Sequence, residues 1–207
     1  MESSKLLAYY EECGIRKKWF SKTVAEYDND PDAKNMVVNY LKDVKSMYKD
    51  GVGLYLWGAN GTGKSHLMHC SFKALVSARY TVRILTLDEI VDKFTSSWYD
   101  EDERTSFHRM LRTVDFLGID EFGKNVDSSG SPAYLPDLVK RVVESVIRYR
   151  VQANKPIWIT SNTEPKNVME VFSEDIASLL REACVTVNVC GEDYRKTIQK
   201  RNARRLK

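Results

Sequence analysis

The sequence has few of the residues that build metal sites or disulfide frameworks. It contains four scattered cysteines and three histidines, and no two cysteines form a CxxC pair. Zinc sites need closely spaced ligands, and disulfide scaffolds need a higher density of cysteine. Both classes are therefore excluded as the organising principle. We interpret the thiols as small buried side chains: Cys13, Cys70, Cys184 and Cys190.

Long apolar runs are also lacking. No run reaches the length that spans a bilayer, and the first residues, MESSKLLAYYEECGIRKK, do not show the basic-then-apolar order of a secretory signal. Internal repeats and low-complexity tracts are missing as well. We therefore expect a soluble cytoplasmic protein with no membrane contact.

The charge balance is too even to diagnose a partner. Thirty-two basic residues face 29 acidic ones, which gives a net charge of +3. The last thirteen residues, RKTIQKRNARRLK, nevertheless carry seven cations and no anion. A solvated chain end is one interpretation, and contact with nucleic-acid phosphates is the other. The second makes candidate DNA contacts of Arg195, Lys196, Lys200, Arg201, Arg204 and Arg205.

Hydrophobic periodicity predicts the fold class. The short apolar runs VGLYLW, TVRILTL, VDFLGI and PIWITS indicate four buried strands, and segments with helical spacing separate them. We expect Asp88 to cap the helix after the second strand. Strands alternating with helices predict a single α/β domain with a parallel sheet covered on both faces, and with binding sites at the carboxyl ends of its strands.

The residues before the first strand are polar and helical in pattern. A break at Asn29-Asp30-Pro31 separates a helix predicted over 6–27 from a second one over 33–48, in which apolar residues recur at helical spacing. We therefore predict three parts. They are a short helical extension over 1–50, the main domain over 51–195 and a basic tail over 196–207.

The strongest motif lies between the first predicted strand and the next helix. It has the GxxxxGK[ST] pattern of a P-loop, whose backbone N–H groups cradle phosphates at a helix N-terminus. Lys64 would reach the β- and γ-phosphates, and the Ser65 hydroxyl would bind Mg²⁺. The expected nucleotide-binding residues are Gly58, Ala59, Asn60, Gly61, Thr62, Gly63, Lys64, Ser65 and His66.

Polar residues follow two further strands. Asp120 and Glu121 end the run FLGIDE in a Walker B pattern, which predicts Asp120 as a Mg²⁺ ligand and Glu121 as the residue that activates water. Asn162 ends the run IWITSN, where it would contact the γ-phosphate or the attacking water as a sensor 1 residue. Helix capping or turn formation is the competing interpretation at both places.

Together these motifs resemble the AAA+ ATPases of the DnaC/DnaI helicase-loader group, whose relative is the transposition ATPase IstB. The matching segments are Cys13-Gly-Ile15, GLYLWGANGTGKSHL, VDFLGIDEFG, KPIWITSN and the closing Gly191-Glu-Asp-Tyr-Arg195. The resemblance implies an AAA+ ATPase that binds ATP and Mg²⁺, with Lys64, Glu121 and Asn162 as catalytic residues. It also implies self-assembly, single-stranded DNA and a hexameric replicative helicase as partners, in the cytoplasm of a bacterium or of a phage-infected host.

One departure from the family concerns its two arginines in the helix near residue 175. Asp175 and Leu179 occupy those positions here, so Arg181 becomes the candidate interface arginine, with Arg148 or Arg150 as substitutes. Two other functions stay open, namely an IstB-like ATPase on duplex DNA and a non-hydrolysing adaptor or inhibitor of a host loader. The aromatic residues Trp19, Phe20 and Trp98 are either partner contacts or structural.

Overall fold

A five-stranded parallel sheet forms the centre of the molecule. The computed structural model describes residues 2–97, 100–122, 137–168, 172–195 and 199. The strand order is β2-β3-β4-β1-β5, and each neighbouring pair runs parallel. The predicted parallel α/β fold is confirmed, and the sheet contains one more strand than the sequence predicts. The strands are β1 (Gly53–Trp57), β2 (Val82–Thr86), β3 (Phe116–Phe122), β4 (Ile157–Ser161) and β5 (Cys184–Asn188).

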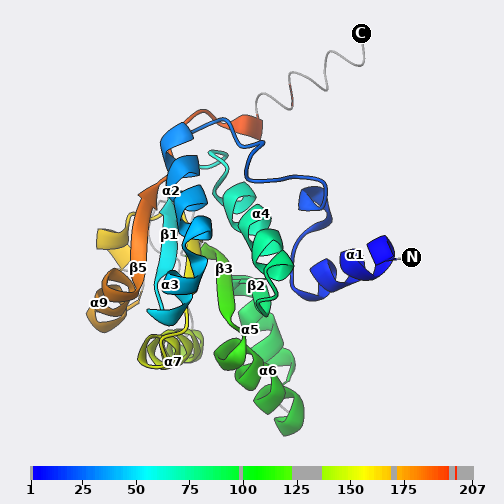
Figure 1. Cartoon of the computed structure of the whole chain (residues 1–207). Helices are drawn as coiled ribbons and strands as arrows, with labels where there is room; N and C mark the ends of the chain where they lie inside the picture. Colours follow the sequence, from blue (N-terminus) through cyan, green and yellow to red (C-terminus); the bar gives the residue numbers. More distant parts are fainter. Residues whose placement is uncertain (1, 98–99, 123–136, 169–171, 196–198, 200–207) are drawn as a thin grey trace.

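Helices cover both faces of this sheet, as Figure 1 shows. Short 3₁₀ turns, η1 (Lys17–Trp19) and η2 (Pro165–Asn167), interrupt two of the connections. The helices are α1 (Glu2–Glu12), α2 (Pro31–Lys42), α3 (Val44–Lys49), α4 (Lys64–Ser77), α5 (Leu87–Ser96), α6 (Glu101–Thr113), α7 (Asp137–Gln152) and α9 (Glu174–Ala183).

Alternate residues of each central strand point to opposite faces of the sheet. In β1, Leu54 and Leu56 join a hydrophobic cluster that includes residues of α2 and α4, whereas Tyr55 joins a second cluster with residues of α5, α6, α7 and α9. In β4, Trp158 belongs to the first cluster, and Ile157 and Ile159 belong to the second. This double burial explains why the central strands are nearly continuous apolar runs.

The segment before α2 differs from the prediction of one helix over 6–27. Helix α1 ends at Glu12, because Gly14 takes a positive φ of 80° and its backbone lies against β2, where a Cβ would be 2.0 Å from the Ile84 carbonyl oxygen. The Ile84 N–H donates to the Cys13 carbonyl at 2.8 Å. The N-terminal segment thus occupies hydrogen-bonding positions on the edge strand of the sheet.

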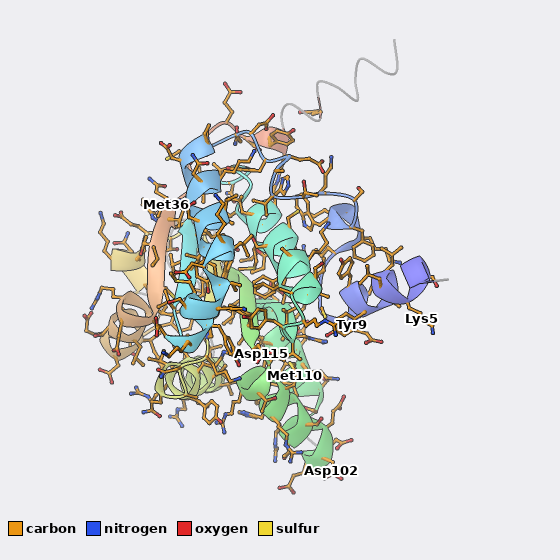
Figure 2. All side chains as sticks on the ribbon, viewed as in Figure 1. Lys5, Tyr9, Met36, Asp102, Met110 and Asp115 are labelled. Atoms are coloured by element: carbon orange, nitrogen blue, oxygen red, sulfur yellow. The ribbon has the colours of Figure 1, made fainter. Side chains whose placement is uncertain are left out.

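Helix α2 begins where the sequence predicts a break. The Asp30 carboxylate accepts hydrogen bonds from the N–H groups of Asp32 and Ala33, and Pro31 occupies the first turn. Residues on both sides of this cap are buried in the cluster that contains α4, among them Ile15 and Val37. The first fifty residues therefore share a core with the sheet. In Figure 2 the labelled Lys5 and Tyr9 mark α1, which projects from one side of it.

A buried arginine holds the opposite end of the sheet together. Arg150, at the end of α7, is 0% exposed, and its guanidinium donates to five backbone carbonyls just before β3 and β4. These belong to Leu111, Arg112, Val114, Asp115 and Pro156. Figure 2 shows Asp115 at this lower end. Because Arg150 is enclosed, the idea that it serves a neighbouring subunit as an arginine finger is wrong for this structure.

Candidate nucleotide-binding site

The P-loop joins β1 to α4 at the carboxyl edge of the sheet. Two of its positions need glycine. The φ angles are positive, at 80° for Gly61 and 103° for Gly63, and close neighbours leave no room for a Cβ. A Cβ at Gly61 would lie 1.8 Å from the Asp193 carboxylate, and one at Gly63 would lie 2.4 Å from the Tyr27 ring. Segments from both ends of the chain therefore pack directly on the loop.

Lys64 lies in the first turn of α4 with its ammonium turned into the loop. It is 8% exposed, and Nζ donates to the carbonyl oxygens of Gly58 at 2.8 Å and Ala59 at 2.7 Å. Burial lowers the pKa of Lys64 to about 8; the nearby Asp120 opposes this shift, and Arg195 adds to it. The two carbonyl oxygens therefore only partly offset the cost of burying the positive charge of Lys64.

Asp120 lies at the end of β3 in a buried polar cluster. Its Oδ1 accepts hydrogen bonds from Ser65 Oγ at 2.9 Å and from Thr160 Oγ1, and its Oδ2 lies 3.4 Å from His69 Nε2. Burial alone would raise the pKa of Asp120, but His69, Thr160 and Ser65 outweigh it and lower the pKa to about 2. The carboxylate is therefore ionised at neutral pH although it is 1% exposed.

Glu121 follows in an unusual backbone conformation. Its φ is 63°, in the left-handed region that side chains with a Cβ rarely adopt, and the β3–β4 register shifts between Ile119 and Phe122. The Glu121 N–H donates to Thr160 Oγ1 at 3.0 Å. The irregularity turns the strand so that Glu121 lines the cavity beside the P-loop, whereas Asp120 stays buried.

Asn162 connects the end of β4 to the P-loop. Its Nδ2 donates to Asn60 Oδ1 at 2.9 Å, and both residues line the same cavity. The alternative prediction is that Asn162 forms a turn. In the structure Ser161 makes the turn contact instead, because its hydroxyl accepts from the Thr163 N–H at 2.9 Å. Asn162 is therefore in position to contact whatever occupies the loop.

The cavity in front of the P-loop has a volume of about 360 Å³. Its walls come from four places, which are the segment after α1, the P-loop with the start of α4, the ends of β3 and β4, and the segment after β5. The sequence predicts the second and third of these. It does not predict Lys18, Trp19 and Tyr27 from the first, although a cluster of basic and aromatic residues there was a usable signal.

The structure brings most of the predicted site residues together. Asn60 to His66, Glu121 and Asn162 line the cavity, Gly58 and Ala59 hold Lys64 through their carbonyls, and Asp120 contacts Ser65. Arg195, predicted as a DNA contact, also lines this cavity. The other predicted DNA contacts, Lys196, Lys200, Arg201, Arg204 and Arg205, lie outside the described residues, as does Trp98.

Arg181 lies elsewhere. It is in the last turn of α9, half exposed, where it forms an ion pair with Glu174 at 2.7 Å. Arg148 forms a similar exposed pair with Asp175 at 3.5 Å. Among the described residues, the cavity wall includes none from α7 or α9.

Ser65 at the start of α4 and Asp120 at the end of β3 fit a magnesium ion. Mg²⁺ prefers oxygen ligands and is bound in phosphate sites through one or two protein groups, with phosphate oxygens and water completing the shell. Ser65 and Asp120 offer a hydroxyl and an ionised carboxylate 2.9 Å apart. Asp120 Oδ2 is buried and accepts no hydrogen bond of good geometry within the part of the chain that the structure describes, although His69 Nε2 lies 3.4 Å away. The donor chemistry is therefore suitable.

No helix in the described ranges has both the length and the apolar character that a bilayer crossing requires.

Comparison with known proteins agrees with the motifs. The family model of AFG1-like ATPases matches residues 16–205. The replicative helicase loader DnaI of Bacillus subtilis (strain 168) is 25% identical over 137 residues, which are 66% of this chain and 41% of that protein. The chain thus spans less than half the length of this relative.

Solved structures share the fold. The crystal structure of the DnaC helicase loader superposes with a TM-score of 0.72 at 18% identity, over 84% of this chain and 100% of that one. The replication initiator DnaA bound to AMPPCP and single-stranded DNA gives a TM-score of 0.68 at 16% identity, over 86% of this chain and 51% of that one. The predicted resemblance to the helicase-loader group of AAA+ proteins is confirmed.

Proposed function

This chain belongs to the family of AFG1-like ATPases, and from this premise we propose that it binds ATP with Mg²⁺ and hydrolyses it to ADP and phosphate. One observation supports the proposal above others. Three separate turns of the chain bring Lys64, Ser65, Glu121 and Asn162 around one cavity at one edge of the sheet, and Asp120 accepts a hydrogen bond from Ser65 there. Phosphoryl transfer depends on such positioning and on fixed charges.

Each side chain has a role that its geometry allows. Lys64 would exchange its two loop carbonyls for the β- and γ-phosphate oxygens, and the N–H groups at the start of α4 would face the same anions. Ser65 and Asp120 would hold Mg²⁺. The bound ion would neutralise charge on the phosphates.

Glu121 and Asn162 would act on the attacking water. Both line the cavity at neighbouring strand ends. Glu121 would accept a proton from water as its oxygen attacks the γ-phosphorus, and the bond from that phosphorus to the β-γ bridging oxygen would break. ADP and inorganic phosphate leave, and the proton returns to solvent from the Glu121 carboxyl group.

For the biological role, we propose an ATP-dependent DNA replication protein that assembles side by side and helps place a hexameric helicase on single-stranded DNA. The likeness to DnaI and DnaC supports this role. Arg181 is the proposed interface arginine, and its ion pair with Glu174 would have to open on assembly. The basic residues after Arg195 are proposed to contact DNA.

The deciding experiment is steady-state ATP hydrolysis by the full chain and by Glu121→Gln. Each is assayed alone, with single-stranded DNA, with duplex DNA, and with a hexameric replicative helicase. We expect Glu121→Gln to bind ATP normally and to lose at least about 100-fold in turnover, because it loses the proton acceptor. Glu182→Gln, an exposed change on α9, is the matched control.

The effector separates the candidate functions. Stimulation by single-stranded DNA or helicase supports the loader role, and stimulation by duplex DNA alone would indicate an IstB-like ATPase. Tight ATP binding without turnover in every condition would instead indicate an adaptor or inhibitor. The ion pair between Arg181 and Glu174 on α9 favours that last candidate, because it would have to open before Arg181 could reach a neighbour's nucleotide.

A further inference from the structure

The segment after β5 is fastened to the P-loop. The Tyr194 N–H donates to the Gly61 carbonyl at 3.0 Å, and the Asp193 carboxylate accepts from the Arg195 N–H at 3.0 Å. Asn29 Nδ2 bridges this segment and the loop, because it donates to the carbonyls of both Glu192 and Thr62. These contacts hold the backbone of Arg195 beside the loop, and Arg195 lines the cavity.

The segment after α1 is fastened to the same loop and to the first turn of α4. The Trp19 ring stacks on His66, with centroids 4.9 Å apart, and Lys18 Nζ lies 4.8 Å from the Trp19 ring centre. His66 Nε2 lies 3.0 Å from the Thr23 carbonyl, and the Tyr27 hydroxyl donates to the Thr62 carbonyl at 2.8 Å. Aromatic contacts with the first turn of α4 therefore position Lys18 at the cavity wall.

The charges of Lys18 and Arg195 act on the catalytic cluster. Burial and the neighbouring Arg16 and Arg195 lower the pKa of Lys18, while Asp120 and Glu121 oppose the shift. Arg195 likewise helps lower the pKa of Lys64. Lys18, Lys64 and Arg195 line the same cavity, and Arg195 is close enough to repel each of the other two, so an anion bound in the cavity would relieve that repulsion.

We propose that Lys18 and Arg195 bind the γ-phosphate of ATP within the same chain that carries Lys64, so that the chain distinguishes ATP from ADP without an arginine from a neighbour. The inference rests on the proposed ATP binding and goes beyond it. The resemblance predicts that residues of α9 contact the phosphates, but Arg181 of α9 forms an ion pair with Glu174. We assign those phosphate contacts to Lys18 and Arg195 instead. Arg195 then faces nucleotide phosphate, not DNA.

The test is equilibrium binding of Mg²⁺ with a non-hydrolysable ATP analogue and, separately, with ADP. It is done at chain concentrations below those at which the protein self-associates. We expect Lys18→Gln and Arg195→Gln each to reduce the preference for the ATP analogue over ADP by about tenfold, the size of one charge-assisted contact. Lys18→Arg and Arg195→Lys should retain most of the preference, because they keep the charge.

Two matched variants control for general effects of charge. Lys17 is the neighbour of Lys18 in the same 3₁₀ turn, but its side chain is 77% exposed and pairs with Glu11. Arg141 is exposed on α7. Lys17→Gln and Arg141→Gln should leave the nucleotide preference unchanged.

The outcomes separate this inference from the proposed function. A wild-type chain that binds neither nucleotide would refute the proposed ATP binding itself. If the wild type binds both but Lys18→Gln and Arg195→Gln weaken them equally, or not at all, the γ-phosphate assignment is overturned while ATP binding stands. A preference that appears only once the protein assembles would also overturn it, because the cations would then act between chains.

Discussion

Two buried cations, Lys64 and Arg150, lie at opposite edges of the same sheet and are held in different ways. Arg150 is enclosed at the amino ends of β3 and β4, where five carbonyls accept its hydrogen bonds. Lys64 lies at the carboxyl edge with two carbonyl partners and a cavity beside it. Burial lowers both pKa values, to about 10 for Arg150 and about 8 for Lys64.

The difference shows how one fold separates stability from binding. The fork of an arginine matches several fixed acceptors at once, so Arg150 can join three chain segments permanently. A lysine is a compact charge on a flexible stem, so Lys64 can leave two loop carbonyls for a better acceptor. We therefore expect changes at Arg150 to affect unfolding and changes at Lys64 to affect nucleotide binding.

The largest expected effect is at Arg150. Arg150→Met keeps an apolar stem of similar length but leaves five backbone carbonyls, two of them in buried hydrogen bonds, without this donor. We expect the free energy of unfolding to fall by about 3–5 kcal/mol, measured by urea denaturation. Arg148→Met, which removes an exposed ion pair, should change it by less than about 1 kcal/mol. Equal effects would contradict the structural role of Arg150.

The next effect is at Lys64. Lys64→Met should weaken binding of ATP and Mg²⁺ at least about 100-fold, or about 3 kcal/mol, because the phosphates lose a charged donor. The free energy of unfolding should change by no more than about 1 kcal/mol, because only two loop carbonyls lose their partner. Titration calorimetry and urea denaturation of the same sample measure both quantities. A variant that binds ATP normally would break the comparison.

The smallest effect concerns pH. Phosphates bind protonated Lys64, so ATP affinity should fall as pH rises through the pKa of about 8 in the free protein. Between pH 7 and pH 9 the protonated fraction, and hence the affinity, drops by about tenfold. Calorimetry should also detect proton uptake on binding near pH 8. The ATP affinity of Lys64→Met should depend little on pH in this range. If the affinity of the wild type were equally independent of pH, the pKa of Lys64 would not lie near 8.

Most of the sheet could be predicted from the sequence because its central strands are buried on both faces. The edge strand β5, CVTVN, could not, since exposed side chains at Val185 and Thr186 interrupt its pattern. The predicted cap of α5 at Asp88 is wrong. Thr86, not Asp88, accepts from the Glu89 N–H, in a capping box that the spacing of Thr86 and Glu89 already contained.

The residues of the candidate site likewise differ in whether local sequence patterns predict their positions. Lys64, Asp120 and Asn162 follow strands whose ends meet at one edge, so local patterns were enough to predict their proximity. Lys18 and Arg195 reach the cavity only because distant segments fold back on the P-loop, through contacts such as Tyr194 to Gly61. The basic and aromatic residues around Lys18 are a local signal, but no local pattern places Arg195 beside the P-loop, so the sequence predicts Arg195 only as a DNA contact.

The backbone of Glu121 has a consequence for any attempt to improve this protein. Holding a residue with a Cβ at a φ of 63° costs on the order of 1 kcal/mol or more, a strain that glycine would relieve. Under the proposed catalytic role of Glu121, a selection for heat resistance alone would tend to replace this residue and yield more stable variants without turnover. The proposed activity and the stability would then compete at this position, so thermostabilised libraries need a turnover screen alongside the melting temperature.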